Sequence, residues 1–182
     1  MGVANVAAGK PKVGGAVYIG ATSLTLPTDS TTALDVGFTS LGYCSDSGLV
    51  QEISRDSEDI KAWGGDTVLI TQTDYAETYT FTLIETLDVN VKKAAFGDAN
   101  VSGALSTGIT TNGNSKELGA HAWVFEMVQN GATVRKVLPN AMVSEIGEIT
   151  YSDSEAIGYE LTVKALPDSS GNCSYEYAKK AS

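Results

Sequence analysis

Few residues of this chain have the types and spacing that chemistry needs. His121 is the only histidine in the sequence, so no second imidazole exists to complete a zinc site. Asp56, Glu58 and Asp59 carry oxygen ligands that suit calcium, but the central glycine and terminal glutamate of an EF-hand loop are missing. A G-x-S-x-G elbow, a phosphate-binding loop and a dinucleotide-binding glycine motif are also missing. We therefore expect a protein that is not an enzyme and holds no cofactor and no metal.

Two chemical questions stay open at this level. A hydrolase would need only two carboxylates that meet in the folded chain, and sequence spacing does not reveal such a pair. Cys44 and Cys173 lie far apart and lack the spacing of metal ligands, so whether they pair is also open. Reduced thiols are typical of proteins made in a cytosol.

The sequence is acidic, with a formal net charge of −10 at pH 7. The excess gathers in two segments: residues 44–66 carry six acids against Arg55 and Lys61, and residues 144–168 carry six against Lys164. An acidic surface repels phosphate, which argues against ordinary nucleic-acid binding. The most common role of such an excess is solubility.

Length and composition favour a single domain over residues 1–182, with a core of its own. No apolar run is long enough to cross a bilayer, and the first residues lack the pattern of a secretory signal. We therefore expect synthesis in the cytoplasm and no membrane partner. Residues 1–12 and 178–182 are expected to be flexible termini.

Period-two alternation of apolar and polar residues predicts that strands dominate. The clearest strand is 75–87, whose second face is mostly threonine. Asp88 is placed to cap a short helix, 89–96, which Gly97 closes. The apolar face of the strand is expected to contain Tyr75, Tyr79, Phe81, Leu83 and Leu87.

Residues 121–138 are predicted to form a β-hairpin, because Asn130-Gly131 is the favoured pair for a type I′ turn. Pairing outward from that turn sets Glu126 opposite Arg135, a charge pair worth about a few tenths of a kcal/mol. Pro139 and the residue after it are expected to end the run. One face of the hairpin collects Trp123, Phe125, Met127, Val134 and Leu138.

The remaining segments complete a mainly β chain with one short helix, which favours a sandwich or barrel. The expected elements are a strand at 13–19, a loop at 20–40, a loop with a weak strand at 98–119, strands at 141–151 and 155–166, a turn at 168–171 and a last strand at 173–177.

Residues 41–62 form a long, polar, extended stretch without a helical apolar stripe, and a turn follows at 63–66. Such a hairpin has little core of its own to bury, so it makes most sense as an arm that lies on a neighbouring subunit. The alternative is a floppy surface hairpin. We assign the arm to residues 44–66, with expected contacts from Glu52, Ile53, Arg55, Asp56, Ile60 and Trp63.

Two blocks within this stretch resemble a known family. Residues 41–49 (LGYCSDSGL) and 53–65 (ISRDSEDIKAWGG) look like a segment of the major tail tube proteins of siphophages, the bacteriophages with long non-contractile tails. The segments 80–85 (TFTLIE) and 138–147 (LPNAMVSEIG) are also similar. The resemblance covers residues 38–166 and is most specific in the first two blocks.

The resemblance implies a β-sandwich or barrel-like tail tube fold with a flanking helix and a long hairpin arm. It implies rings of six subunits whose sheets join around a lumen, and rings that stack into a helical tube in the virion tail. The implied partners are other copies of the chain, the tape measure, tail terminator and baseplate proteins, and double-stranded DNA that passes without specific binding. The family has no catalytic residues to carry over.

Six chains of charge −10 would give each ring a formal charge of about −60. Acids that face the lumen would repel phosphate and let DNA slide during ejection into the host. The acids expected to face the lumen are Glu52, Asp74, Glu77, Glu145, Glu148 and Glu160.

Other classes remain as alternatives. A β-sandwich binding module of a surface protein, immunoglobulin-like or carbohydrate-binding, would need an exposed aromatic platform or a signal sequence. Within the phage class, a tail terminator, a head–tail connector or the tube protein of a contractile tail fits the same pattern less well than the siphophage tube does.

Overall fold

The computed structural model describes residues 6–12 and 15–180. Within these residues there is one short α-helix, and strands make up the rest of the regular structure apart from one 3₁₀ turn (Asp98–Asn100). The elements in chain order are β1 (Gly9–Pro11), β2 (Val17–Gly20), β3 (Thr39–Ser40), β4 (Cys44–Lys61), β5 (Thr67–Leu83), α1 (Val89–Phe96), β6 (Val101–Ala104), β7 (Gly108–Thr111), β8 (His121–Gln129), β9 (Ala132–Ile146), β10 (Tyr159–Ala165) and β11 (Tyr175–Lys180).

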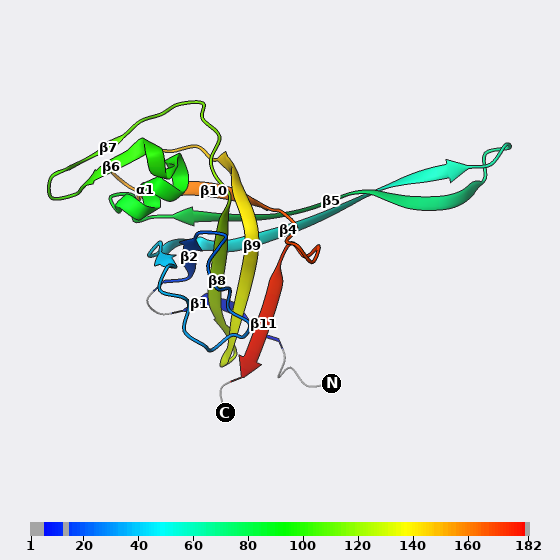
Figure 1. Ribbon diagram of the computed structural model, residues 1–182, viewed down its shortest axis with the longest axis horizontal. Helices are drawn as coiled ribbons and strands as arrows, with labels where there is room; N and C mark the ends of the chain where they lie inside the picture. Colours follow the sequence, from blue (N-terminus) through cyan, green and yellow to red (C-terminus); the bar gives the residue numbers. More distant parts are fainter. Residues whose placement is uncertain (1–5, 13–14, 181–182) are drawn as a thin grey trace.

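Nine strands of the described chain form one antiparallel sheet (Figure 1). Seven of them follow the order β3-β2-β8-β9-β10-β5-β4, while β1 pairs with β8 and β11 pairs with β9. Strands β6 and β7 form a separate two-stranded sheet that contacts α1. Strand β4 therefore has β5 as its partner on one side and ends the main path of the sheet.

The sheet curls so that β5 faces β8 across the core. Three strand spacings separate these strands along the sheet, which would be about 14 Å in a flat sheet. The ring centroids of Tyr79 and Phe125 nevertheless lie 5.6 Å apart, and Phe81 lies 5.7 Å from Trp123. This packing of two sheet layers confirms the predicted mainly β, sandwich-like fold.

The helix begins and ends where the sequence predicts. The Asp88 side chain accepts a hydrogen bond of 2.6 Å from the amide of Asn90, and Gly97 ends the helix with a φ of 92°. The buried side of the helix joins the main core through Val91, Ala94 and Ala95.

Segment 20–40, predicted as a loop, covers the second face of the β8–β9 hairpin. Phe38 and the leucines at 24, 26 and 34 pack there against Val124 and Val137. The hairpin is therefore buried on both faces, whereas the sequence pattern predicts only the face that contains Trp123 and Phe125. This explains how a polar, loop-like segment is held in place with only the two-residue strand β3 as regular structure at its end.

The turn of this hairpin and its register are confirmed. Asn130 and Gly131 both have positive φ, 46° and 77°, as a type I′ turn requires. Glu126 pairs with Arg135 across the strands. Both side chains are almost fully buried, at 2% and 1% exposure.

Burial changes the energetic weight of the pair. Arg135 Nε donates to Glu126 Oε1 at 2.8 Å, and Arg135 Nη1 donates to the carbonyls of Asp29 and Thr32 at 2.7 and 2.9 Å. Lys12 Nζ lies 2.7 Å from Glu126 Oε2. The sequence predicts an exposed cross-strand pair, whereas both side chains are buried. Removing one partner would therefore leave an uncompensated buried charge, at a cost of about 3–5 kcal/mol.

The predicted break at Pro139 was also wrong, because β9 continues through this residue to Ile146. The register with β8 shifts between His121 and Trp123, which places Pro139 and Asn140 together opposite one residue of β8. A bulge of this kind tolerates a residue without an N–H donor.

Several predicted bounds shift in the structure. Strand β5 covers 67–83 instead of 75–87, so Leu87 lies beyond the strand and is 62% exposed, against the predicted core position. The predicted strands 141–151 and 155–166 are observed as the end of β9 and as β10, and the weak strand in 98–119 is the β6–β7 pair. The last strand, β11, begins and ends later than predicted.

The chain ends take part in the sheet where they are described. Residues 9–11 pair with β8, and residues 178–180 pair with β9. Both segments belong to the termini expected to be flexible. Residues 1–5 and 181–182, and residues 13–14 of the predicted first strand, lie outside the described residues.

Candidate functional site

The most distinctive surface is a hairpin that projects far from the body (Figure 1). It is built from β4 and β5, which pair from Leu49 and Phe81 outward to Lys61 and Thr67. We call residues 56–74 the distal arm. The six residues 56–61 alone span about 20 Å at the usual rise of a strand. The predicted arm, 44–66, covers β4 and the turn, and β5 supplies its second strand.

The turn at the tip follows from its glycines. Gly64 and Gly65 have φ values of 118° and 99°, which residues with a β-carbon rarely adopt. The amide of Ala62 donates to the carbonyl of Asp66 at 2.8 Å and closes the loop. The predicted turn at 63–66 therefore stands where the two strands must reverse.

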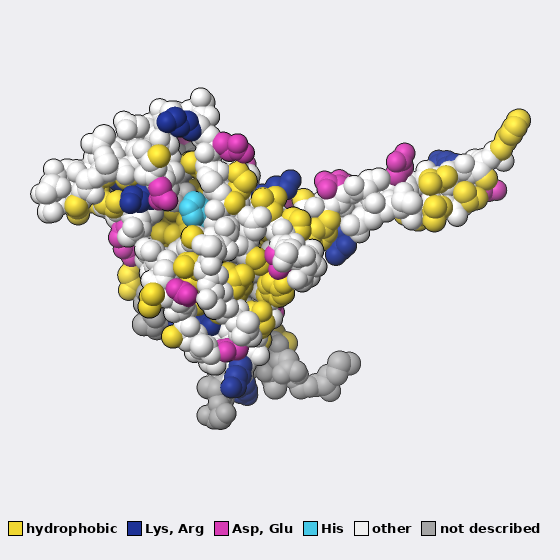
Figure 2. All heavy atoms as spheres, viewed as in Figure 1, with side chains coloured by type: hydrophobic (Ala, Val, Ile, Leu, Met, Phe, Trp, Pro, Cys, Tyr) yellow, Lys and Arg dark blue, Asp and Glu magenta, His cyan; other side chains and the backbone are white. Residues whose placement is uncertain are grey.

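Every residue of the distal arm is exposed in the protomer. Trp63 at the tip is fully exposed at 106%, and Ile60 next to the turn is 47% exposed. All six residues expected to make arm contacts are exposed, and Glu52, Ile53 and Arg55 lie nearer the body than the other three. Figure 2 shows apolar side chains gathered along the outer part of the arm.

The sequence analysis of the arm missed three apolar residues beyond the turn. Val68, Leu69 and Ile70 are 63%, 53% and 64% exposed. Three consecutive apolar residues just after a glycine turn indicate a strand. The alternation that begins at residue 75 is a stronger signal, so the predicted strand began there and not at residue 67. Isolated two-stranded hairpins are marginal in water, so a long one with an apolar tip is typical of an element that binds a partner.

A buried carboxylate holds the base of the arm. Glu77 is 2% exposed and lies on β5, where the arm joins the body. Its Oε1 accepts hydrogen bonds of 2.7 Å from Gln51 Nε2 on β4 and from Ser174 Oγ just before β11, as well as one from the Tyr79 hydroxyl. Its Oε2 accepts from the Tyr75 hydroxyl at 3.0 Å. Three segments of the chain therefore meet at one side chain.

The electrostatics of this cluster favour a charged Glu77. Burial by itself raises the pKa of a carboxyl, but the hydrogen bonds from Tyr79, Ser174, Tyr75 and Gln51 outweigh it and lower the pKa of Glu77 below its usual value. Burial, and then the Glu77 carboxylate, raise the pKa of the Tyr79 hydroxyl, so that group keeps its proton and donates it. The arm base is thus fixed by charge-assisted hydrogen bonds.

A second candidate surface is the outward side of the sheet over β4, β5, β10 and β9, which we call the acidic sheet face. Cross-strand partners on this side include Glu52 with Thr78, Glu160 with Thr82, and Glu145 with Thr162. The hydroxyls of Thr80 and Thr162 lie 3.0 Å apart. The residues that define the face are Glu52, Thr78, Thr80, Thr82, Glu145, Glu160, Thr162 and Lys164.

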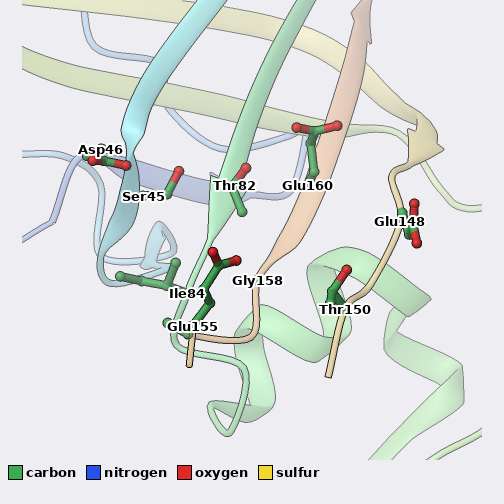
Figure 3. A pocket seen from close by; sticks show the side chains of 10 residues that line it. Ser45, Asp46, Thr82, Ile84, Glu148, Thr150, Glu155, Gly158 and Glu160 are labelled. Atoms are coloured by element: carbon green, nitrogen blue, oxygen red, sulfur yellow. The ribbon is translucent and has the colours of Figure 1, made fainter. Parts of the chain in front are cut away.

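The acidic sheet face continues into a hollow of about 600 Å³ (Figure 3). Four carboxylates line it. Asp46 lies on β4, Glu160 lies on β10, and Glu148 and Glu155 lie on the segment that connects β9 to β10. No lysine or arginine is among its lining residues. The negative potential of the sheet face therefore extends to its edge.

The acids expected to face a lumen fall into three environments. Glu52, Glu145, Glu148 and Glu160 are exposed at the acidic sheet face and its hollow. Asp74 is exposed on the distal arm. Glu77 is buried, and its carboxylate is used by the arm base, so we leave it out of the proposed lumen surface.

The histidine and the two cysteines, whose side chains could take part in chemistry, lie outside the residues that define these two surfaces. His121 Nδ1 lies 3.0 Å from the Gly119 carbonyl, and its Nε2 lies 3.9 Å from the Asp98 carboxylate. Cys44 and Cys173 are free thiols, and burial raises the pKa of Cys44 to about 11. Among the described residues, no group of three or more His, Cys, Asp or Glu is arranged to hold a metal.

None of the helices in the described part of the chain is long and apolar enough to span a membrane.

A sandwich-like β body with a protruding, exposed hairpin is typical of a structural subunit that binds other chains. The comparison with known families agrees with this class. A family model described as phage tail tube protein matches residues 6–181, so the chain belongs to the phage tail tube protein family. No curated protein shows significant similarity to the sequence. Membership makes the chain a structural component of the virion tail that assembles with itself into a tube.

Proposed function

We propose that this chain is the major tail tube subunit of a siphophage. Six copies form a ring, rings stack into a helical tube, and DNA passes through the lumen into the host. The observation that carries this proposal is the arm: an exposed hairpin with an apolar tip, held rigidly at its base. Such an element is useful only if another subunit covers it.

In this proposal the arm docks on neighbouring copies of the chain. The proximal contacts come from Glu52, Ile53 and Arg55, and the distal contacts come from Asp56, Ile60 and Trp63. Exposure of all six residues in the protomer supports this role, because a docked surface must be open before assembly.

The acidic sheet face lines the lumen in this proposal, with Glu145, Glu148 and Glu160 as its main charges and Asp74 as a contribution from the arm. The face carries exposed carboxylates among threonine hydroxyls, and Lys164 is its lysine. Repulsion of phosphate keeps the DNA from adhering to the wall, while hydroxyls keep the wall wet. The tube needs no catalytic group for this task, so the subunit is not an enzyme.

The remaining roles follow from the same assignment. The ends of the tube meet the tape measure, terminator and baseplate proteins, and the subunit is made in the cytoplasm of the bacterial host before assembly.

Replacement of the distal arm tests the proposal. Residues 57–73 are exchanged for Asn-Gly, which joins the paired residues Asp56 and Asp74 by a two-residue turn. We expect a folded protein that forms no tubes in negative-stain micrographs, whereas the wild type forms tubes whose cross-sections average with six-fold symmetry. Tubes of normal yield from the shortened variant would contradict the arm's role, and a different symmetry would contradict the hexamer.

A further inference from the structure

We propose that the outer part of the distal arm, residues 59–70, is inserted between two other copies of the chain, so that both faces of the hairpin become buried there. This inference rests on the proposed function, which requires only that the arm docks on a neighbour. It goes further because it distinguishes an inserted element from one that lies flat on a single surface.

The register of the hairpin carries the inference. Residues that pair directly across two antiparallel strands point to the same face, and neighbours along a strand point to opposite faces. Ile60 pairs with Leu69, so these two apolar side chains share one face. Asp59 pairs with Ile70, so Ile70 lies on the other face. The tip is therefore apolar on both sides.

Exposure agrees with the register. Leu69 is 53% exposed and Ile70 is 64% exposed, although they are adjacent in β5. In a hairpin that covers a core, one of two adjacent residues is buried, as Phe81 is in the body part of the same strand. Docking on a single flat surface would leave one of the two apolar side chains in water, whereas insertion covers both.

The charges of the chain favour its own copies as the occupants on either side. The distal arm is acidic, with five acids against Lys61. The opposite kind of surface exists on the body at the turn end of the β8–β9 hairpin, where β1 and β11 both end. Lys10 pairs there with Val128, and Lys180 pairs with Ala132. The exposed lysines of this basic end are Lys10, Lys179 and Lys180.

The basic end belongs to the same chain but cannot receive its own arm. The arm leaves the body on one side, and the basic end lies where β11 ends beside the turn between β8 and β9, away from the arm (Figure 1). A further copy can present this basic end to the arm, which makes an acidic arm and a basic receptor complementary within one homopolymer.

Single substitutions on each face of the tip test the inference. Leu69→Ser removes the apolar side chain of one face and Ile70→Ser that of the other. Thr71→Ser and Ser57→Thr are matched controls, because Thr71 lies on the face of Leu69 and Ser57, which pairs with Gln72, lies on the face of Ile70. The measurement is the critical concentration for tube formation, by sedimentation and micrographs, with circular dichroism to verify folding.

We expect both apolar substitutions to raise the critical concentration by about tenfold or more, and both controls to leave it unchanged. An effect from only one of the two faces would overturn the insertion and indicate docking on one surface. No effect from either face, in a chain whose arm replacement still abolishes tubes, would also overturn it. Normal tubes from the arm replacement would instead overturn the proposed function itself, so the two failures are distinct.

A photo-crosslinking residue gives a second readout in assembled wild-type tubes. Placed at 69 and, separately, at 70, it should link to two different segments of neighbouring chains, one of them near the basic end. Links from both positions to one and the same segment would contradict insertion.

Discussion

The two tryptophans of the chain lie in opposite environments, and the contrast extends to the regions around them. Trp123 is 0% exposed at the centre of the body, where it meets Phe81, and Trp63 is 106% exposed at the tip of the arm. The body buries a large apolar core and the Glu126–Arg135 ion pair within the protomer. The distal arm leaves its apolar side chains in solvent, and in the proposed assembly another subunit covers them.

The same contrast holds for the two arginines. Arg135 is 1% exposed and binds Glu126 and two backbone carbonyls. Arg55 is exposed, lies 4.6 Å from the centre of the Tyr75 ring and donates to Gln72 at 3.0 Å. In the proposed assembly, arginine therefore serves stability in the body and recognition in the arm.

Substitution of each tryptophan in turn should give the largest difference in stability between the body and the arm. Trp123→Ala is expected to cost about 3–5 kcal/mol of unfolding free energy, because it removes a large side chain from a closed core. Trp63→Ala should change the unfolding free energy by less than about 0.5 kcal/mol, because its side chain touches solvent, yet it should impair tube formation. Urea denaturation and sedimentation measure the two effects. Equal losses of stability would contradict the division between body and arm.

The arginines give the next largest expected effect. Arg135→Gln leaves the buried Glu126 with Lys12 as its remaining cation and should cost about 3 kcal/mol or more, and Arg55→Gln should cost less than about 0.5 kcal/mol. Both changes remove one positive charge, so net charge is controlled. A small loss for Arg135→Gln in urea denaturation would mean that Lys12 alone compensates the carboxylate.

Glu77→Gln tests whether the Glu77 carboxylate fixes the arm to the body. The amide cannot accept all the hydrogen bonds that converge on the carboxylate, so we expect a loss of about 1–3 kcal/mol and faster amide hydrogen exchange at the arm base. Glu52→Gln, on the adjacent strand but exposed, is the matched control and should change neither quantity. Unchanged exchange near Gln51 and Ser174 would show that another contact fixes the arm.

The smallest expected effect is a pH dependence from the same carboxyl. The pKa of Glu77 is lowered on folding, from an ordinary value of 4.5, so its charged form stabilises the protein above that pH. This contribution is lost as the pH falls below about 4.5 and through the lower folded pKa. The stability difference between wild type and Glu77→Gln should therefore shrink between pH 6 and pH 3 in urea titrations. A constant difference would mean that Glu77 does not titrate in this range.

Much of the body could be predicted from the sequence because its signals are local. Asn130-Gly131 sets a two-residue turn, the turn sets the register, and the register brings Glu126 opposite Arg135. Asp88 and Gly97 likewise fix the two ends of the helix. What local signals could not provide is burial: the ion pair is buried because segment 20–40, distant in sequence, lies over it.

The candidate site was less predictable, for a physical reason. Polar composition and the turn at 63–66 indicate a hairpin, and the alternation of apolar residues along 157–165 leaves Glu160 on the exposed face. Glu77, expected among the lumen acids, lies on the same face of β5 as Tyr79 and Phe81 and is buried there. Gln51, Tyr75, Tyr79 and Ser174 meet its carboxylate from three segments, which local patterns do not reveal. The sequence analysis did not predict that the apolar residues 68–70 are exposed on the arm. An apolar strand in solvent is explained by a binding partner, and a single sequence does not show which segments bind partners.

The emission of Trp63 tests most directly the central claim that the arm is covered by other copies of the chain. Trp123 is already buried, so a change in tryptophan emission on assembly reports on Trp63. We expect the emission maximum to shift to shorter wavelength and acrylamide quenching to fall when subunits form tubes, and both changes to be absent in Trp63→Phe. Tubes in which Trp63 emits and is quenched as in the free subunit would contradict the claim.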